Sequence, residues 1–100
     1  MSEHVSFAEA KRRHFKTLEQ YVPIVARVHG PSHPEFHDVR SVFDAIVGKV
    51  KEAGKHAPDL HEEFSRLREI THGYQVPADV CETYEAVYRM LAQLDEAYHE

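Results

Sequence analysis

Apolar residues recur at intervals of three, four and seven positions in four separate stretches of this 100-residue chain. This spacing places them on one face of an α-helix, and no stretch shows the strict alternation of a half-buried β-strand. The pattern therefore predicts an all-α protein with helices at about residues 7–28, 33–53, 60–72 and 78–98. Because the connections between them are short, we expect residues 1–100 to form one domain, an up-down-up-down four-helix bundle.

Capping and turn residues mark where each helix should begin and end. The first helix follows a capping box, Ser6-Phe7-Ala8-Glu9, and the second is expected to use the same pattern at Ser32-His33-Pro34-Glu35. Asp59 precedes the third helix, and Pro77-Ala78-Asp79 opens the fourth. The first three helices are expected to stop at Gly30-Pro31, Gly54 and His72-Gly73.

The helical periodicity also predicts which side chains face the core. The inward positions are Phe7, Ala10, Leu18, Tyr21, Val25 and Val28 on the first helix and Phe36, Val39, Phe43, Ile46, Val50 and Ala53 on the second. They are Leu60, Phe64 and Leu67 on the third helix and Val80, Tyr84, Val87, Leu91, Leu94 and Tyr98 on the fourth.

Composition and charge exclude several classes of function. The formal net charge is −5 with histidine neutral, and the only basic cluster is Lys11-Arg12-Arg13 with Lys16, so we expect no nucleic-acid partner. The apolar runs are too short to span a bilayer, and we expect no membrane association. The first residues lack the features of a secretory signal, and the single Cys81 cannot form an intrachain disulfide, which together favour the cytoplasm.

Nine histidines are an unusually large number for a chain of this length. If consecutive helices alternate in direction, two groups of side chains gather at opposite ends of the bundle. One group is His29, His33, His37 and His72 with Cys81, and the other is His4, His56, His61 and His99.

His14 differs from the other histidines because it lies seven residues from both Phe7 and Tyr21, on the expected buried face of the first helix. A buried imidazole there would bond to a carboxylate or tyrosine, or would serve as a ligand to a metal or substrate. At that height it would meet the other helices near Gly48, Glu63, Gln93 and Asp95.

His29 and His33 flank the Gly30-Pro31 turn, with His37 one helical turn further on, and their nitrogens suit zinc or iron. Histidines at helix C-termini also occur because imidazole interacts well with free carbonyl groups, which would account for His29 and His72. His14, His29 and His33 are the candidate metal ligands, with iron or zinc as the possible cofactor. No catalytic residue is assigned.

Two further features suggest chemistry less strongly. Glu96-Ala97-Tyr98-His99 has the Glu-x-x-His spacing that di-iron bundles use, but it occurs once and in the last helical turn. Cys81 lies near the start of the fourth helix, where the helix dipole favours a thiolate, although a packed, inert thiol is the more common case.

Two segments resemble a known family. Val28-His29-Gly30-Pro31-Ser32-His33-Pro34-Glu35-Phe36 is similar to the V-H-G-x-x-H-P-E-L segment of the iron-sulfur cluster repair di-iron proteins. Tyr74-Gln75-Val76-Pro77-Ala78-Asp79-Val80-Cys81-Glu82-Thr83-Tyr84 is similar to that family's Y-x-x-P-x-D-x-C-x-T-Y segment, and Leu67-Arg68 with Thr71 and Ala86-Val87-Tyr88 extend the match. The resemblance implies a hemerythrin-like bundle that carries iron.

The chain departs from this family at most of the metal ligands that the resemblance implies. Where the family has a histidine-x-x-x-glutamate pair on its second helix, the sequence reads Lys51-Glu52-Ala53-Gly54-Lys55, and Ala57 stands near an isolated family histidine. The family's last pair would begin beyond Glu100. Only His14 matches a ligand position, so we expect a shortened form without a complete di-iron site in one protomer.

Three functions remain open. We favour a binding or interaction protein that forms a homodimer or docks a protein partner, and that is not an enzyme. The alternative is an iron-binding protein of iron-sulfur cluster repair or the nitrosative-stress response, whose site involves His14 or is shared across a dimer. A third possibility is an enzyme with a pocket lined by His14, Tyr21 and Tyr84.

Overall fold

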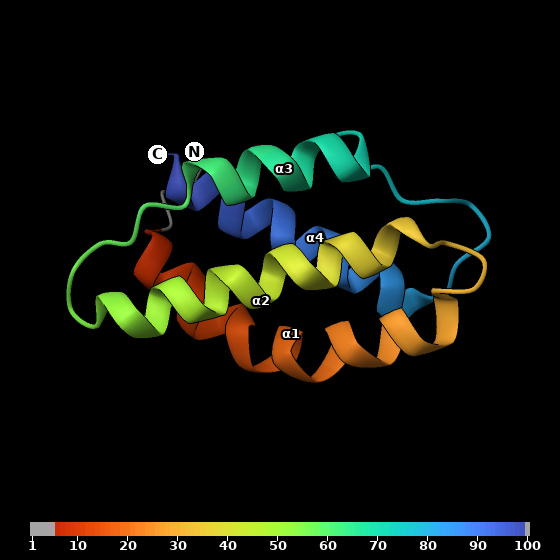
Figure 1. The fold of residues 1–100 in the computed structure, drawn as a ribbon, viewed down its shortest axis with the longest axis horizontal. Coiled ribbons are helices and arrows are strands. Elements are labelled where there is room, and N and C mark those ends of the chain that lie inside the picture. The colour runs from red at the N-terminus through yellow and green to blue at the C-terminus, as the bar shows by residue number, and fades with distance from the viewer. Residues whose placement is uncertain (1–5, 100) are drawn as a thin grey trace, which may run out of the picture.

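A computed structural model describes residues 6–99 of the chain. Four helices follow one another: α1 (Phe7–His29), α2 (Glu35–Ala53), α3 (His61–Thr71) and α4 (Glu82–Tyr98). Figure 1 shows that each helix runs opposite to the one before it, and the described residues contain no strand. The predicted all-α, four-helix bundle is therefore confirmed.

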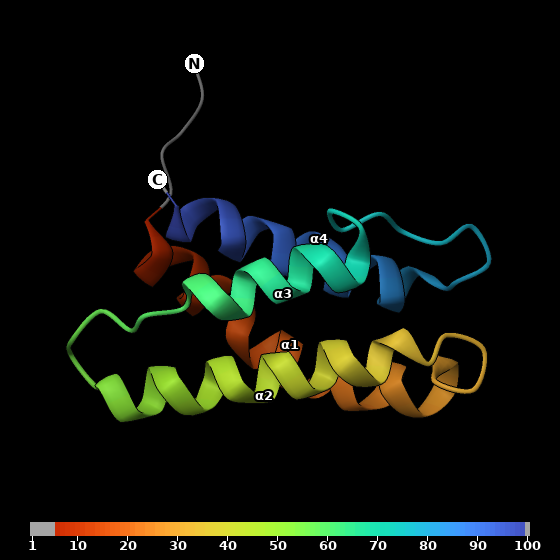
Figure 2. The same ribbon diagram turned by 45° about the horizontal axis from the view of Figure 1, so that its top comes forward.

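The helices pack so that the chain's connections gather at two ends. α1 lies along α4 and also contacts α2, while α2 lies along α3. The turn between α1 and α2 lies at the same end as the loop between α3 and α4, and Figure 2 shows this arrangement from a second direction. The two segments that carry the family resemblance are consequently brought to one end of the bundle.

The core consists of apolar and aromatic side chains from all four helices. Most predicted inward positions are buried or half-buried, but Val28 is 59% exposed and Val22 is buried instead. Val28 lies seven residues beyond Tyr21, which is already at the edge of the buried face. An α-helix rotates by about 20° over seven residues, and this drift carries Val28 into solvent.

The beginning of α1 and both ends of α3 agree with the sequence prediction. The Ser6 hydroxyl accepts a hydrogen bond from the Glu9 backbone N–H at 3.2 Å, although the Glu9 carboxylate pairs with Arg12 and Arg13 instead of returning to the cap. At α3, Asp59 Oδ1 accepts from the His61 backbone N–H at 3.3 Å. The helix ends in a left-handed turn at His72 (φ 54°) and Gly73 (φ 75°).

The predicted starts of the second and fourth helices are wrong. α2 begins at Glu35 instead of residue 33, because the residue before a proline is disfavoured in the helical region and His33 precedes Pro34. α4 begins at Glu82 instead of residue 78, since Ala78 and Asp79 form a turn and Cys81 is the extended N-cap residue. Within residues 6–99, no helix is long and apolar enough to cross a membrane.

Candidate functional site

Five side chains meet where the α1–α2 turn faces the α3–α4 loop. We call this cluster the histidine end; its members are His29, His33, Glu35, Asp79 and Cys81. The local backbone explains why they meet. The chain reverses within residues 30–34, so His29 and His33 lie on either side of a tight turn, and the His33 backbone N–H donates to the His29 carbonyl oxygen at 2.7 Å.

His29 and Cys81 form the first contact across the two connections. His29 Nε2 lies 3.2 Å from Cys81 Sγ, although the residues are 52 positions apart in the sequence. Cys81 is exposed and is the N-cap of α4, so its thiol is not packed into the core. Its side chain also borders a shallow surface depression lined by Val76, Pro77, Ala78, Val80, Glu82 and Glu85.

His33 forms the second contact and holds two carboxylates. Its Nδ1 lies 3.1 Å from Glu35 Oε2, and its Nε2 lies 3.1 Å from Asp79 Oδ1. A carboxylate only accepts hydrogen bonds, and a neutral imidazole has only one N–H to donate. A neutral His33 can therefore donate to only one of these two carboxylates at a time.

A buried pair of tyrosines lies directly beneath the two histidines. The Tyr84 ring is inaccessible to solvent and packs edge-on against His29 and His33, with ring centres 5.4 and 5.6 Å away. Tyr84 and Tyr88 share a hydrogen bond of 3.2 Å between their hydroxyl oxygens. Burial raises the pKa of both phenols, so they stay protonated near neutral pH.

The other two histidines predicted at this end do not join the cluster. His37 is exposed on the first turn of α2, where its ring lies against Gly30. His72 is the exposed left-handed residue that ends α3. Both are placed by their helix ends, and neither contacts His29, His33 or Cys81 among the hydrogen bonds of the described residues.

The carboxylates expected near His14 have other partners, since Glu63 pairs with Lys49 and Asp95 with Arg68, whereas the expected Gln93 does hydrogen-bond to His14. Its side chain is half-buried and faces α4, with Gln93 and Arg89 as its neighbours. Burial lowers the pKa of His14 below its ordinary value, a hydrogen bond with Gln93 opposes this shift, and Arg13 and Arg89 reinforce it. Because burial disfavours the charged ring and Arg13 and Arg89 repel it, the neutral form of His14 is favoured.

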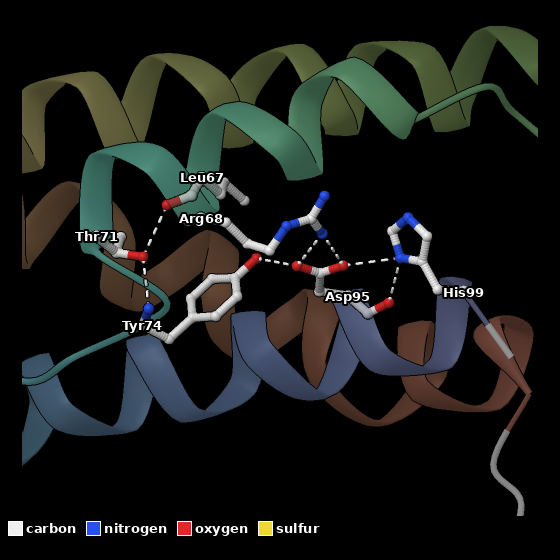
Figure 3. Close-up of polar contacts among 6 residues, drawn as sticks. All are labelled: Leu67, Arg68, Thr71, Tyr74, Asp95 and His99. Atoms are coloured by element: carbon white, nitrogen blue, oxygen red, sulfur yellow. Dashed lines mark hydrogen bonds and ion pairs between the residues drawn. The ribbon is translucent and has the colours of Figure 1, made fainter.

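Asp95, which was a predicted neighbour of His14, instead anchors a polar network that joins α4 to α3 and to the loop after α3 (Figure 3). Arg68 Nη1 donates to both carboxylate oxygens, at 2.7 and 2.8 Å, and the Tyr74 hydroxyl donates at 2.7 Å. His99 Nδ1 lies 2.8 Å from the same carboxylate. Sequence reasoning missed this network, although a charged residue at an inward position of α4, four residues after Leu91, was a signal for it.

The Asp95 network also fixes the loop that follows α3. Thr71 Oγ1 donates to the Leu67 carbonyl oxygen and accepts from the Tyr74 backbone N–H, both at 2.7 Å. These bonds hold Tyr74 at a positive φ of 65°, directly after His72 and Gly73. Burial and the Asp95 carboxylate raise the pKa of Tyr74, which keeps its hydroxyl protonated as a donor.

At the opposite end of the bundle, the expected histidines are only partly placed. His61 and His99 lie together with ring centres 5.3 Å apart, and His56 is exposed in the α2–α3 loop. His4 lies outside the described residues. His99 Nδ1 bonds to Asp95, and the hydrogen bonds of the described residues include none between Glu96 and His99.

The structure does not bring the three candidate metal ligands together. His14 faces the middle of α4, whereas His29 and His33 lie at the end of the bundle. Among residues 6–99, no group of three or more histidine, cysteine, aspartate or glutamate side chains is arranged to hold a metal ion. Within residues 6–99, the buried polar residues Thr71 and Asp95 are already hydrogen-bonded, whereas the buried Oε1 of Glu63 has no hydrogen-bond partner.

The residues proposed for an enzyme pocket are also separated. Tyr84 is buried beneath His29 and His33, while Tyr21 borders a surface depression with Thr83, Ala86 and Arg89. His14 lies against Gln93. These three side chains therefore do not line one pocket.

Comparison with known proteins agrees with the resemblance found in the two sequence segments. The chain is 27% identical to the iron-sulfur cluster repair protein ScdA of Staphylococcus haemolyticus over 94% of its length. It is 25% identical to the ScdA proteins of two Staphylococcus epidermidis strains over 95% of its length. These matches confirm the resemblance to iron-sulfur cluster repair proteins.

The comparison also shows how much of those proteins the chain covers. It spans 56% of the length of each relative. The alignment with the first extends over 125 residues but includes only 94% of this 100-residue chain, so about 31 aligned positions have no counterpart here. The chain is thus internally shorter than that relative. No family model and no solved structure matches the chain, and the hemerythrin-like type of the bundle stays a prediction.

Proposed function

We propose that this chain is a cytoplasmic, hemerythrin-like binding protein of iron-sulfur cluster repair, and that it holds no di-iron centre between its own helices. One observation carries the proposal. The two segments that resemble the repair proteins touch each other, through His29 with Cys81 and His33 with Asp79, on the outside of the bundle. The shared residues therefore form a surface that a partner can reach.

The residues present do not fit a di-iron centre inside the bundle. Such centres need several carboxylates and histidines that point inward from facing helices. Here the interior of the described bundle is filled by side chains such as Leu18, Phe43 and Leu91, and the buried carboxylate of Asp95 is committed to Arg68 and Tyr74. No step of the proposed function passes through a metal held there.

The first test measures binding to an iron-sulfur dehydratase. Affinity is measured for two forms of this enzyme, one with an intact cluster and one with a cluster damaged by nitric oxide. Fluorescence anisotropy of the labelled chain would measure the affinity. We expect Cys81→Ser and His33→Ala to weaken binding about tenfold, and His56→Ala at the opposite end to bind normally. Equal affinity for all three variants would contradict the histidine end as the docking surface.

The metal arm tests the absence of an intrachain di-iron centre. The protein is purified without chelator, loaded with ferrous iron under anaerobic conditions and desalted. We expect less than about 0.1 equivalent of iron per chain. A di-iron centre needs several deprotonated ligands around the same position, and the side chains of this chain are not arranged in that way. A stable pair of irons in each monomer would overturn this part of the proposal.

A metal site shared by two copies is the second candidate function, linked to cluster repair or nitrosative stress. His29 Nε2 and Cys81 Sγ are two donors of the kind that iron and zinc accept, and they lie 3.2 Å apart on the surface. Two copies would supply four. The same assay distinguishes this candidate, because it requires about 0.5 metal per chain together with a dimeric mass in solution.

A further inference from the structure

His61 and His99 form a second pair of metal-type side chains, far from the histidine end. His61 is the first residue of α3 and His99 follows the last turn of α4, so 38 positions of sequence separate them. Both side chains are exposed, and their ring centres lie 5.3 Å apart. Tyr98 supports both rings, with ring centres 5.2 Å from His61 and 5.1 Å from His99.

The Asp95 carboxylate determines which nitrogen of His99 is available. His99 Nδ1 lies 2.8 Å from Asp95 Oδ1 and 2.9 Å from the Asp95 backbone carbonyl oxygen, and both oxygens are acceptors. Nδ1 therefore carries a proton, and in the neutral ring Nε2 keeps its lone pair. A histidine held through its other nitrogen by a carboxylate, as Figure 3 shows for His99, is the usual arrangement of a metal-binding histidine.

The spacing of the two rings also suits one shared cation. Two imidazoles that bind the same tetrahedral ion, each through a nitrogen at about 2.1 Å, have ring centres about 5 Å apart. The ring centres lie 5.3 Å apart with their planes at 64°, so a shared ion also requires side-chain rotations that turn one nitrogen of each ring toward the same point. The first turn of α3 also carries Glu62, and Glu96 lies three residues before His99, so the surrounding sequence is acidic.

From this geometry we infer that His61 and His99 form a bis-histidine site for a borderline divalent cation such as zinc or nickel. Imidazole nitrogens favour this class of ion over calcium or magnesium, which prefer oxygen ligands. No third histidine, cysteine or carboxylate within residues 6–99 completes the site, so water fills the remaining positions. The bound ion ties the first turn of α3 to the end of α4, and this inference does not depend on the proposed function.

The experiment titrates the full chain with zinc and follows the ring signals of all nine histidines by NMR. Cys81→Ser serves as the background, because a thiol at the histidine end would compete for zinc. We expect the signals of His61 and His99 to shift together and the thermal midpoint to rise with zinc concentration. Shifts confined to His29, His33 and His37 would overturn the inference.

Single substitutions test each ligand. His61→Ala and His99→Ala remove exposed side chains and should each weaken zinc binding by at least about tenfold, whereas His56→Ala should bind as the parent does. Wild-type zinc affinity in either His61→Ala or His99→Ala would overturn the inference. Loss of zinc binding in His56→Ala would overturn it as well.

The positioning role of Asp95 needs a matched pair of variants. Asp95→Asn removes the carboxylate that holds His99 Nδ1 and should weaken zinc binding by about 10–100-fold. Tyr74→Phe removes another contact to the same carboxylate but leaves His99 in place, so zinc affinity should not change. Circular dichroism confirms that both variants are folded, and equal affinities for them would contradict the positioning role.

Discussion

Asp95 is an acidic residue that is only 5% exposed. Its burial is tolerated because its carboxylate accepts hydrogen bonds from the side chains around it, which Figure 3 shows. The residue stands on the buried face of α4, where most inward positions are apolar. Its contacts to Arg68, Tyr74 and His99 come from α3, from the following loop and from its own helix. A single carboxylate thus joins three segments, and its removal would leave the donors without a partner.

We expect Asp95→Asn to lower the free energy of unfolding by about 2–3 kcal/mol, because charged hydrogen bonds are lost while Arg68 keeps its charge. Urea denaturation measures the change. Tyr74→Phe, which removes one hydroxyl, should cost about 1 kcal/mol, and the exposed Asp38→Asn should cost less than about 0.5 kcal/mol. A smaller loss for Asp95→Asn than for Tyr74→Phe would contradict the central role of the carboxylate.

His14 predicts a dependence of stability on pH. Its folded-state pKa is lowered by burial, so the unfolded chain takes up a proton at a higher pH than the folded chain does. The stabilisation from neutral His14 is therefore complete above the unfolded pKa of about 6.5 and is lost as the pH falls through the folded pKa. Urea unfolding of the wild type and of His14→Gln at several pH values measures this effect.

The difference between these two proteins isolates His14, because the other histidines are common to both. We expect the wild type to lose stability relative to His14→Gln as the solution is acidified. Parallel stability curves would show that the protonation of His14 is the same in the folded and unfolded states.

At the scale of the elements, local sequence signals predicted α1 and α3 well and α2 and α4 less well. The capping signals at Ser6 and Asp59 act within a few residues, so sequence alone suffices there. His33 and Asp79 also read as helix-start residues, but their side chains pair with each other across the bundle. A contact over 46 positions leaves no trace in local periodicity, and the histidine end was for that reason predicted only as a gathering of residues.

Two glycines, one at the C-cap of α1 and one inside α2, give opposite predictions for the same substitution. A Cβ at Gly30 would collide with the Ala26 carbonyl oxygen and the His37 ring, so Gly30→Ala should destabilise the fold by about 1–3 kcal/mol. A Cβ at Gly48 meets nothing within 4 Å in the middle of α2, so Gly48→Ala should stabilise the fold by about 0.5–1 kcal/mol. Thermal unfolding of both variants compares them, and equal midpoints would refute the close approach at Gly30.

At the scale of the whole molecule, the bundle depends on an apolar core shared by all four helices. This part of the fold was the most predictable from sequence, because burial follows the helical period. The candidate ligands were the least predictable. His14 was expected on the buried face, and the difference between a core position and its edge is a rotation of a few tens of degrees, which periodicity does not resolve.

Leu94 is fully buried in this core, and Leu94→Ala should lower the free energy of unfolding by about 2–5 kcal/mol by leaving a cavity. For a domain of this size, the loss is a large part of a typical stability of about 5–15 kcal/mol. Ile24→Ala, at a site that is 45% exposed, should change it by less than about 0.5 kcal/mol. Calorimetry measures the midpoint of thermal unfolding of both variants. An equal decrease in the two midpoints would contradict the assignment of Leu94 to the core.

The contacts of His29 with Cys81 and of His33 with Asp79 also make the two connections at that end open as one unit. The His33 amide bonds to the His29 carbonyl oxygen, and the Glu85 amide bonds to the Cys81 carbonyl oxygen. Hydrogen–deuterium exchange at the His33 and Glu85 amides should therefore give the same opening free energy for both. In a His29→Ala, His33→Ala double variant the two exchange rates should separate, because each connection then fluctuates alone.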